Sequence, residues 1–389
     1  MYKVRTYNAL SDKGLSRFSA DKYVVSEDCA VPDAFMLRSQ KLHTEVVPDS
    51  LLAVARAGAG VNNIPIADYT QQGIVVFNTP GANANAVKEL IVAGLLLGSR
   101  DIYGGMTYVQ ELGHIGDSAE MGKLLEKEKK RFAGTEIVGK TLGVVGLGAI
   151  GSIIANLALD LGMNVIGYDP AISVEAAWQL SSQVERMESL EKLLASADFV
   201  TLHVPAIPAT KHLINSKVLS GMKTTAKILN FAREEIVSTD DMVNALDKGL
   251  IAGYISDFPA PALLGRKDVI LMPHIGASTE EAEENCAVMA ADQLKDFLEN
   301  GNIYNSVNYP PTKMSRNGGS RITFTNKNVP KVLGQVLSLL ADANLNVVDM
   351  VNKSRGEIAY NIIDVEGDID GAVIDSVASV DGVMRVRLI

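Results

Sequence analysis

The sequence has little that would suit secretion or a membrane. Its two cysteines, Cys29 and Cys286, lie far apart without a metal-binding spacing, a usage typical of a reducing compartment. No stretch approaches the roughly 20 apolar residues that a membrane span needs. The first residues show no apolar run behind their charges, so we expect no signal peptide. The sequence predicts a cytoplasmic protein with no membrane partner and no metal.

The sequence also lacks an excess of positive charge. It carries 36 Lys and Arg against 46 Asp and Glu, for a net charge of −10. A nucleic-acid or membrane partner would want a basic face, so we expect neither. A small anionic substrate stays compatible, because a few local Arg and Lys residues can set the field of one cleft. With 389 residues, the chain is too long for one core and suits two or three domains.

What is present is an alternation of short apolar runs with longer helical patterns, which predicts parallel sheets covered by helices. Residues 110–135 interrupt this rhythm with an exposed, charged segment. Near residue 308 the composition changes again. Residues 309–320 have the composition of a linker, in which prolines first restrict the backbone and glycines then make it flexible. Beyond it the order strand, helix, strand, strand, helix, strand predicts a ferredoxin-like βαββαβ unit. Its elements are expected at Arg321–Thr325, Pro330–Ala343, Asn346–Asn352, Ile358–Val365, Gly371–Ala378 and Val383–Leu388.

A dinucleotide fingerprint stands between the two parts. Gly146, Gly148 and Gly151 form G-x-G-x-x-G directly after an apolar strand. Gly146 would permit a tight turn, and Gly148 would let the backbone approach a pyrophosphate closely. Gly151 would allow close contact between the helix and the strand. A lone motif of this kind also occurs as an ordinary glycine-rich turn. Here a helix (152–161) and a second strand (164–168) follow in register, and Asp169 can bind the ribose hydroxyls. Asp169 opposes a 2′-phosphate, so the motif favours NAD over NADP.

Hydride transfer to or from a 2-hydroxy acid needs a base for the hydroxyl proton and a cation for the carboxylate. Of five histidines, His43, His114 and His212 fall in polar segments. His203 ends a buried strand, where either a cleft wall or a satisfied core histidine would fit. His274 ends an apolar strand just before a helix, and we predict it as the base.

Arg233 is the predicted cation. It ends the strand 227–231, and an arginine at the carboxyl end of a strand in a doubly wound sheet faces the ligand crevice. The plainer alternative is an ion pair with the neighbouring Glu234 or Glu235.

Several motifs together resemble one family. The chain resembles the D-2-hydroxyacid dehydrogenases over essentially its whole length, and within them the branch that acts on D-3-phosphoglycerate in serine biosynthesis. The motifs that carry this resemblance are Arg56–Asn63, Asn78–Asn83, Gly146–Gly151, Leu202–Pro205, Leu229–Arg233 and Pro273–Thr279.

The resemblance implies an α/β fold with two doubly wound parallel-sheet domains of Rossmann or flavodoxin-like type and a C-terminal ferredoxin-like ACT domain. The implied boundaries are a discontinuous substrate domain (1–92 and 272–308), an NAD domain (93–271), a linker (309–320) and the ACT domain (321–389). The charged 110–135 segment would belong to a dimerisation region. A homodimer, or a homotetramer through ACT pairing, is therefore expected.

The resemblance also assigns roles to residues. Arg233 would orient the substrate, and His274 would be the acid/base. Arg38 would reach the substrate phosphate, and the partner subunit would donate a basic residue at the position of Lys129. The expected cofactor residues are Gly146, Gly148, Ala149, Ile150, Gly151, Asp169, His203, Val204, Pro205, Ala232 and Asp257; the expected substrate residues are Arg38, Arg56, Gly58, Ala59, Gly60, Asn83 and Lys129.

Two departures from the family pattern stand out. The carboxylate that usually partners the catalytic histidine falls at Ala260, so that pair is missing at its expected place. Loss of the carboxylate should lower the pKa of the base, unless Asp257 or another acid substitutes. In the tail, the family's serine-binding positions match Asn326, Asn328 and Asn346, but the first of them is usually histidine. An amino-acid effector at the ACT domain, serine first, is a hypothesis.

Two other functions remain open at this point. One is a related dehydrogenase that acts on glyoxylate, hydroxypyruvate or 2-hydroxyglutarate. Arg38 argues against this alternative, because it favours a phosphorylated substrate. The other is a non-catalytic NAD(H)-sensing protein, which the missing carboxylate makes conceivable and the retention of Arg233 and His274 opposes.

Overall fold

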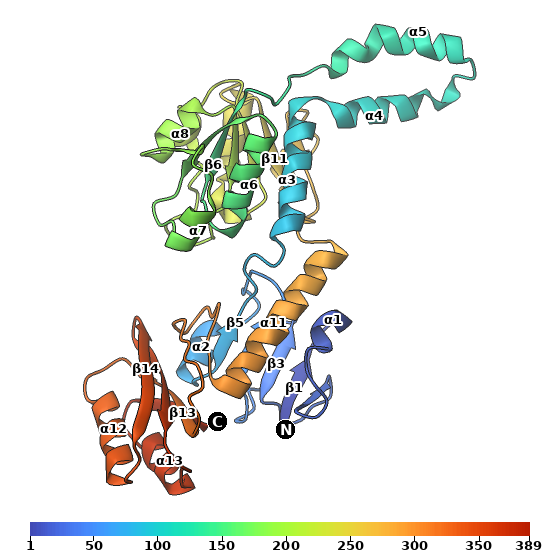
Figure 1. The fold of residues 1–389 in the computed structure, drawn as a ribbon. Coiled ribbons are helices and arrows are strands. Elements are labelled where there is room, and N and C mark those ends of the chain that lie inside the picture. The colour runs from blue at the N-terminus through green and yellow to red at the C-terminus, as the bar shows by residue number, and fades with distance from the viewer. The chain divides into compact units, whose positions relative to one another are not determined.

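The structure is a computed structural model that describes residues 1–389, with the side chain of Glu175 excepted. The chain forms two compact units (Figure 1). The first unit combines Met1–Asn83 with Thr279–Ile389, and the second is Ala84–Ser278. None of the described helices is long and apolar enough to cross a membrane.

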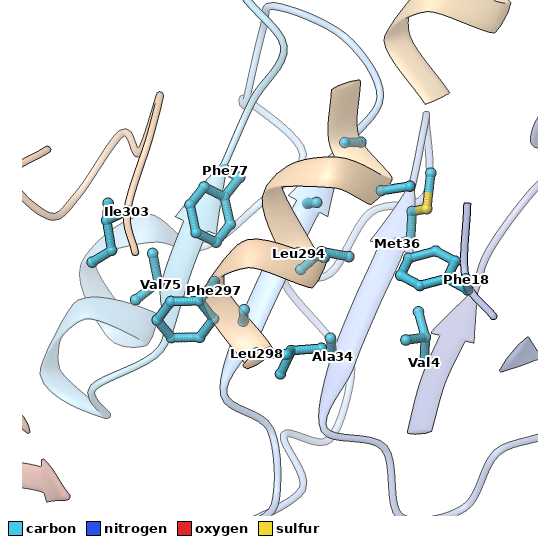
Figure 2. Packing of buried hydrophobic residues seen from close by; sticks show 14 of the residues in the cluster. Val4, Phe18, Ala34, Met36, Val75, Phe77, Leu294, Phe297, Leu298 and Ile303 are labelled. Atoms are coloured by element: carbon cyan, nitrogen blue, oxygen red, sulfur yellow. The ribbon is translucent and has the colours of Figure 1, made fainter. Parts of the chain in front are cut away.

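The first unit is built on a five-stranded parallel sheet in the order β2-β1-β3-β4-β5. Its central strands are buried on both faces, as parallel strands are. The long helix α11 (Glu280–Asn300) packs on one face, where Phe297 meets Phe77 edge-on at 5.6 Å between ring centroids (Figure 2). The other elements are β1 (Tyr2–Thr6), α1 (Asp12–Leu15), β2 (Tyr23–Ser26), β3 (Ala34–Leu37), β4 (Ala53–Arg56), α2 (Ile66–Gln71) and β5 (Val75–Phe77).

The second unit contains a seven-stranded parallel sheet in the order β12-β11-β10-β9-β6-β7-β8. The strand order reverses at β6, since β7 lies on one side of it and β9 on the other; ligands bind outside such switch points. The strands are β6 (Thr141–Val145), β7 (Asn164–Tyr168), β8 (Glu185–Arg186), β9 (Phe199–Leu202), β10 (Lys227–Asn230), β11 (Gly253–Ser256) and β12 (Val269–Leu271). The helices are α3 (Ala84–Ser99), α6 (Ala149–Asp160), α7 (Val174–Gln179), α8 (Leu190–Ser196), α9 (Ser216–Leu219) and α10 (Thr239–Asp247), with 3-10 turns at Glu234–Ile236 and Pro261–Leu263.

A helical arm extends from the end of α3 and returns to β6 (Figure 1). It comprises α4 (Ile102–Glu111), α5 (Ser118–Glu128) and two 3-10 turns, Leu112–His114 and Lys129–Phe132. Within the described chain, α4 and α5 contribute no buried residue. The Tyr108 and Phe132 rings hold the two halves of the arm together at 5.5 Å between centroids.

The C-terminal part of the first unit has the order βαββαβ and forms an antiparallel sheet, β14-β15-β13-β16. One sheet face packs on its two helices, and the other packs on the parallel sheet through Tyr360 and Ile362. The two parallel sheets and this separate antiparallel sheet confirm the predicted α/β class. The elements are β13 (Ser320–Lys327), α12 (Val332–Asp342), β14 (Val347–Arg355), β15 (Ile358–Val365), α13 (Gly371–Ala378) and β16 (Val383–Leu388).

Arginines of the antiparallel sheet line its contact with the parallel one. Arg321 is fully buried; it pairs with Asp364 and donates to the carbonyl oxygens of Asn300, Met314 and Ser315. Arg387 donates to the Leu298 carbonyl oxygen at 2.9 Å, in the last turn of α11. The negative end of the α11 dipole therefore meets cations from the C-terminal sheet.

The segment 309–320 is part of this contact. Tyr309 is fully buried and donates to the Thr70 carbonyl oxygen at 2.9 Å, and Thr312 is 2% exposed. The first half of the segment is therefore packed core, while Gly318 and Gly319 near its end take positive φ angles of 86° and 72°.

Candidate active site

In both units, the residues singled out from the sequence follow the carboxyl ends of parallel strands. In the second unit, Gly146 follows β6, His203 follows β9, Arg233 lies three residues after β10, and Asp257 directly follows β11. Parallel strands bring such residues to one edge of the sheet, which is where ligands bind in this fold.

The glycine loop has a shape that side chains would spoil. Gly146 has φ of +90°, and a Cβ on it would come within 2.6 Å of the His203 carbonyl oxygen. A Cβ on Gly151 would lie 1.9 Å from the Gly146 carbonyl oxygen. At Gly148 no atom lies within 4 Å of the corresponding position, so the space there is open. Gly146 and Gly151 therefore close the turn, while Gly148 leaves room for a ligand.

The first turn of α6 faces this open space with unsatisfied donors. Gly148 is the N-cap, and no side chain caps the helix. The helix starts at Ala149, three residues before the predicted start at Ser152, so Ala149 and Ile150 lie in its first turn. Free N–H groups and the positive end of the dipole favour a phosphate here. The loop thus fits the pyrophosphate of a dinucleotide.

Asp169 directly follows β7 and bonds to this loop. Its carboxylate accepts from the Leu147 backbone N–H at 2.8 Å and from the Ala171 backbone N–H at 2.8 Å. The residue remains partly exposed, so lone pairs stay available for ribose hydroxyls.

His203 lies directly after β9. Its Nε2 is 2.9 Å from the Thr201 hydroxyl, and burial lowers the pKa of His203 to about 3. The ring is therefore neutral at pH 7 and suits a cleft wall rather than a proton carrier. Val204, half-buried, and Pro205, exposed, continue this wall.

Hydrogen bonds to the backbone at and next to Arg233 fix the position of this residue. The amide of Asn230, a fully buried residue, donates to the Arg233 carbonyl oxygen at 2.9 Å and to the Tyr254 hydroxyl at 3.2 Å. The Asn230 side-chain oxygen accepts from the Ala232 N–H at 3.2 Å. The Arg233 guanidinium donates to the Ala232 carbonyl oxygen at 2.6 Å and makes no ion pair within the described residues, so the alternative pairing with Glu234 or Glu235 is not observed.

His274 has a positive φ of 56°, and its ring packs on Phe258 at 4.9 Å between centroids. Among the described residues it has no carboxylate partner. The carboxylate of Asp257, a residue only 1% exposed, accepts instead from the backbone N–H groups of Ile275 at 2.8 Å and Gly276 at 2.7 Å. Asp257 therefore anchors the loop that carries His274 and does not contact the imidazole. Ala260 precedes a short 3-10 turn at Pro261–Leu263.

In the first unit, the loop after β4 presents backbone donors. The Ala59 carbonyl oxygen accepts from the Asn78 side chain at 2.7 Å, and the Gly58 carbonyl oxygen accepts from the Thr79 N–H at 3.1 Å. Arg56 closes the loop by donating to the carbonyl oxygens of Gly60 and Arg38. In the described chain the Ala59 and Gly60 N–H groups have no partner, so they are free to bind an anion.

The remaining predicted substrate residues lie in three places. Arg38 follows β3 and pairs with Glu283 at 2.7 Å. Asn83 ends the first unit's opening segment and has a buried, unpartnered side-chain oxygen. Lys129 lies on the helical arm and pairs with Glu126.

The three predicted effector residues do not meet within one chain. Asn326 and Asn328 lie at one end of the antiparallel sheet, where Asn328 donates to the Gly356 carbonyl oxygen. Asn346 lies at the other end, bonded to Glu366 at 3.1 Å. Asn326 accepts from Asn361 at 2.7 Å, in a buried chain of amides that sequence reasoning did not single out.

No metal site accompanies these residues. Nowhere in the described chain do three histidine, cysteine or acidic side chains gather as ligands.

Comparisons with known proteins agree with this site. Residues 106–276 match the D-isomer specific 2-hydroxyacid dehydrogenase NAD binding domain. The chain is 32% identical to D-3-phosphoglycerate dehydrogenase of Escherichia coli K12, over 91% of this chain and 86% of the relative. It is 40% identical to D-3-phosphoglycerate dehydrogenase of Synechocystis, over 72% of this chain, but spans only 49% of that relative's length.

Solved structures agree as well. The NAD⁺-bound 3-phosphoglycerate dehydrogenase of Entamoeba histolytica superposes with a TM-score of 0.61 at 25% identity, over 79% of this chain and 98% of that one. Fold and site together define a dehydrogenase with the NAD-binding domain of the D-isomer specific 2-hydroxyacid type. Within that class, the chain belongs to the D-3-phosphoglycerate dehydrogenase family.

Proposed function

We propose that this protein catalyses the NAD-dependent oxidation of D-3-phosphoglycerate to 3-phosphohydroxypyruvate, the first step of serine biosynthesis by the phosphorylated route. The main support is that Arg233 and His274 follow β10 and β12, the two strands that flank β11, at the sheet edge that carries the dinucleotide loop. The chain is also 32% identical to the E. coli enzyme over 91% of its length. NAD, when bound, supplies the hydride acceptor at its nicotinamide.

Arg233 would bind the substrate carboxylate. A guanidinium offers two parallel donors to a carboxylate, and it also polarises the neighbouring carbonyl group. Asn230 supports this task because it fixes the backbone on both sides of the Arg233 peptide. Asn230 is thus a positioning residue that the motif around Arg233 contained but sequence reasoning did not assign.

His274 would take the proton from the substrate hydroxyl and return it in the reverse direction. Within the described residues no carboxylate pairs with its imidazole, so the ring must be oriented by other contacts. The Phe258 ring fixes one side of the imidazole, and Asp257 fixes the following loop. Orientation therefore comes from packing and backbone anchoring rather than from an ion pair.

The substrate's anionic groups would engage the first unit. The free N–H groups of Ala59 and Gly60 suit a carboxylate, and Arg38 suits a phosphate. Arg56 and Asn83 border this region, Arg56 by closing the loop and Asn83 by an unpartnered oxygen. Lys129 would act from a second copy of the chain.

We propose the arrangement of domains that the family resemblance implies: a substrate domain (1–92 and 272–308), an NAD domain (93–271), a linker (309–320), whose first half is packed in the core, and an ACT domain (321–389) that takes an amino-acid effector. The βαββαβ order and its packed helices support the last assignment. Because Asn346 lies at the opposite end of the sheet from Asn328, an effector site using both would need two chains. The cytoplasm is the proposed location, which two unpaired cysteines suit.

We further propose a homo-oligomer that pairs through the helical arm. Tyr103, Met106 and Val109 share one face of α4 and are 72%, 64% and 45% exposed. Such an apolar face on an element without a core of its own is typical of a subunit contact.

The deciding experiment follows NADH oxidation with 3-phosphohydroxypyruvate, hydroxypyruvate and 2-ketoglutarate in parallel. Fast turnover confined to the phosphorylated acid is expected. Equal use of hydroxypyruvate would favour a glyoxylate or hydroxypyruvate reductase instead. A His274→Asn variant should bind NADH normally and lose turnover.

An NAD(H)-sensing protein is the second candidate, because His274 lacks a carboxylate partner. Tight NADH binding by the unmodified protein without turnover of any of the three acids would favour it and contradict the proposed enzyme.

A further inference from the structure

One carboxylate stands where the proposed substrate phosphate would bind. Glu283 lies in the first turn of α11, and its Oε1 is 2.7 Å from Nη1 of Arg38. Both side chains are partly exposed, at 41% for Arg38 and 44% for Glu283. The pair is therefore accessible to a competing ion rather than locked in the core.

The charges around this pair converge on one place. Cys286 lies on the same turn of α11, and burial raises the pKa of its thiol. The charges of Arg38, Arg56 and Glu283 also influence this pKa, so all three lie near the thiol. Arg56 is committed to the loop that it closes. Arg38 is thus the cation of this group that a ligand can take over, and Glu283 is its present partner.

We propose that Glu283 is a specificity-determining residue that holds Arg38 while the site is empty and sets the selection between substrates with and without a distal anion, because a distal anion must displace it from Arg38. This inference rests on the proposed function, because it takes Arg38 as the residue that receives the substrate phosphate.

The selection follows from an exchange of partners. A substrate with a distal carboxylate replaces one carboxylate on Arg38 by another and gains little. A phosphate dianion brings twice the charge and three acceptor oxygens, so its exchange with Glu283 is favourable. A substrate with no distal anion leaves the pair intact. Glu283 therefore weakens binding of every distal anion by a similar factor and leaves binding of an acid without a distal anion unchanged.

The test compares Glu283→Gln with Glu284→Gln. Glu284 is the next residue on α11 and pairs with Lys13 at 2.6 Å, so its variant makes the same change in net charge without touching Arg38. We would measure KM for 3-phosphohydroxypyruvate and hydroxypyruvate, the inhibition constant of 2-ketoglutarate, and the thermal midpoint of each variant.

Glu283→Gln should lower KM for 3-phosphohydroxypyruvate and the inhibition constant of 2-ketoglutarate by about two- to fivefold, the range of an exposed ion pair. KM for hydroxypyruvate and the thermal midpoint should stay unchanged. Adding Arg38→Met should abolish the effect of Glu283→Gln.

Two results would overturn the inference while the proposed function stands. One is turnover of the phosphorylated acid with an unchanged or higher KM in Glu283→Gln. The other is an equal fall of KM in Glu284→Gln, which would show a general charge effect. If the unmodified protein does not turn over the phosphorylated acid, the proposed function fails and this inference fails with it.

Discussion

The two units hold their important residues in place by different kinds of contact. At the ligand edge of the second unit, the contacts are close backbone approaches and hydrogen bonds, as at the open space of Gly148, the Asn230 amide and the neutral His203. The charged groups there, Arg233, Asp169 and Asp257, bond to backbone groups and form no ion pair within the described residues. In the first unit, ion pairs hold the corresponding residues in place, as in the exposed Arg38–Glu283 pair and the buried Arg321–Asp364 pair.

The difference teaches which parts of each unit can adjust. A backbone cradle has one shape and suits a ligand that is always the same, as a cofactor is. Exposed ions exchange partners at small cost, which suits a site that must distinguish among substrates. The buried ion pair of the first unit shows the opposite limit, because a desolvated charge needs its partner permanently.

The largest expected effect concerns that buried pair. Asp364→Asn leaves the Arg321 charge without its counter-ion in a fully buried place, so the free energy of unfolding should fall by about 3–5 kcal/mol. Arg321 also binds carbonyl oxygens of residues 300, 314 and 315, and we therefore expect faster proteolysis within 309–320. Urea unfolding and limited proteolysis would measure both changes.

The exposed Asp368→Asn is the matched control, because it removes the same charge from the same sheet end. Equal stability of the two variants would show that the first unit does not depend on the buried ion pair.

A smaller effect is expected at the glycine loop, where two substitutions should separate folding from binding. Gly151→Ala places a Cβ 1.9 Å from a carbonyl oxygen, and such overpacking costs about 1–3 kcal/mol of unfolding free energy. Gly148→Ala meets no atom within 4 Å, so stability should hold while NADH affinity falls. Thermal melting and NADH fluorescence titration would measure the two quantities. Unchanged NADH affinity in Gly148→Ala would contradict the role of the open space.

Local patterns predicted much of this structure. The strand 164–168 after the glycine loop, and the last helix and strand at 371–378 and 383–388, have the predicted bounds. Asn344, just after α12, has a left-handed φ of 60°, a conformation that asparagine tolerates at a helix end. These features succeed because periodicity and capping depend on residues close in sequence.

The residues that sequence reasoning missed act through contacts between distant elements. Asn230 reaches Tyr254 only because β10 and β11 are neighbours in the sheet, and Glu283 meets Arg38 across 245 positions of the sequence. The family resemblance made Asp257 an expected cofactor residue. Its two bonds to the loop after His274 depend on a β11–β12 arrangement that no local pattern contains.

The smallest expected effect concerns His203, where the neutral character of the second unit can be tested by pH. Burial lowers the pKa of His203 from 6.5 to about 3, so between these values the unfolded chain binds a proton that the folded protein does not. Stability should therefore fall as pH drops through this window, by at most about 1.4 kcal/mol per pH unit from this residue, because it accounts for one proton. His203→Gln removes this contribution, so its urea midpoint should fall less steeply than that of the unmodified protein between pH 6.5 and pH 5.

The exposed His114→Gln is the control and should follow the unmodified protein. Parallel curves for all three proteins would mean that His203 takes up its proton in the folded state. The contrast between a second-unit edge without ion pairs and a first unit that relies on them would then lose one of its supports.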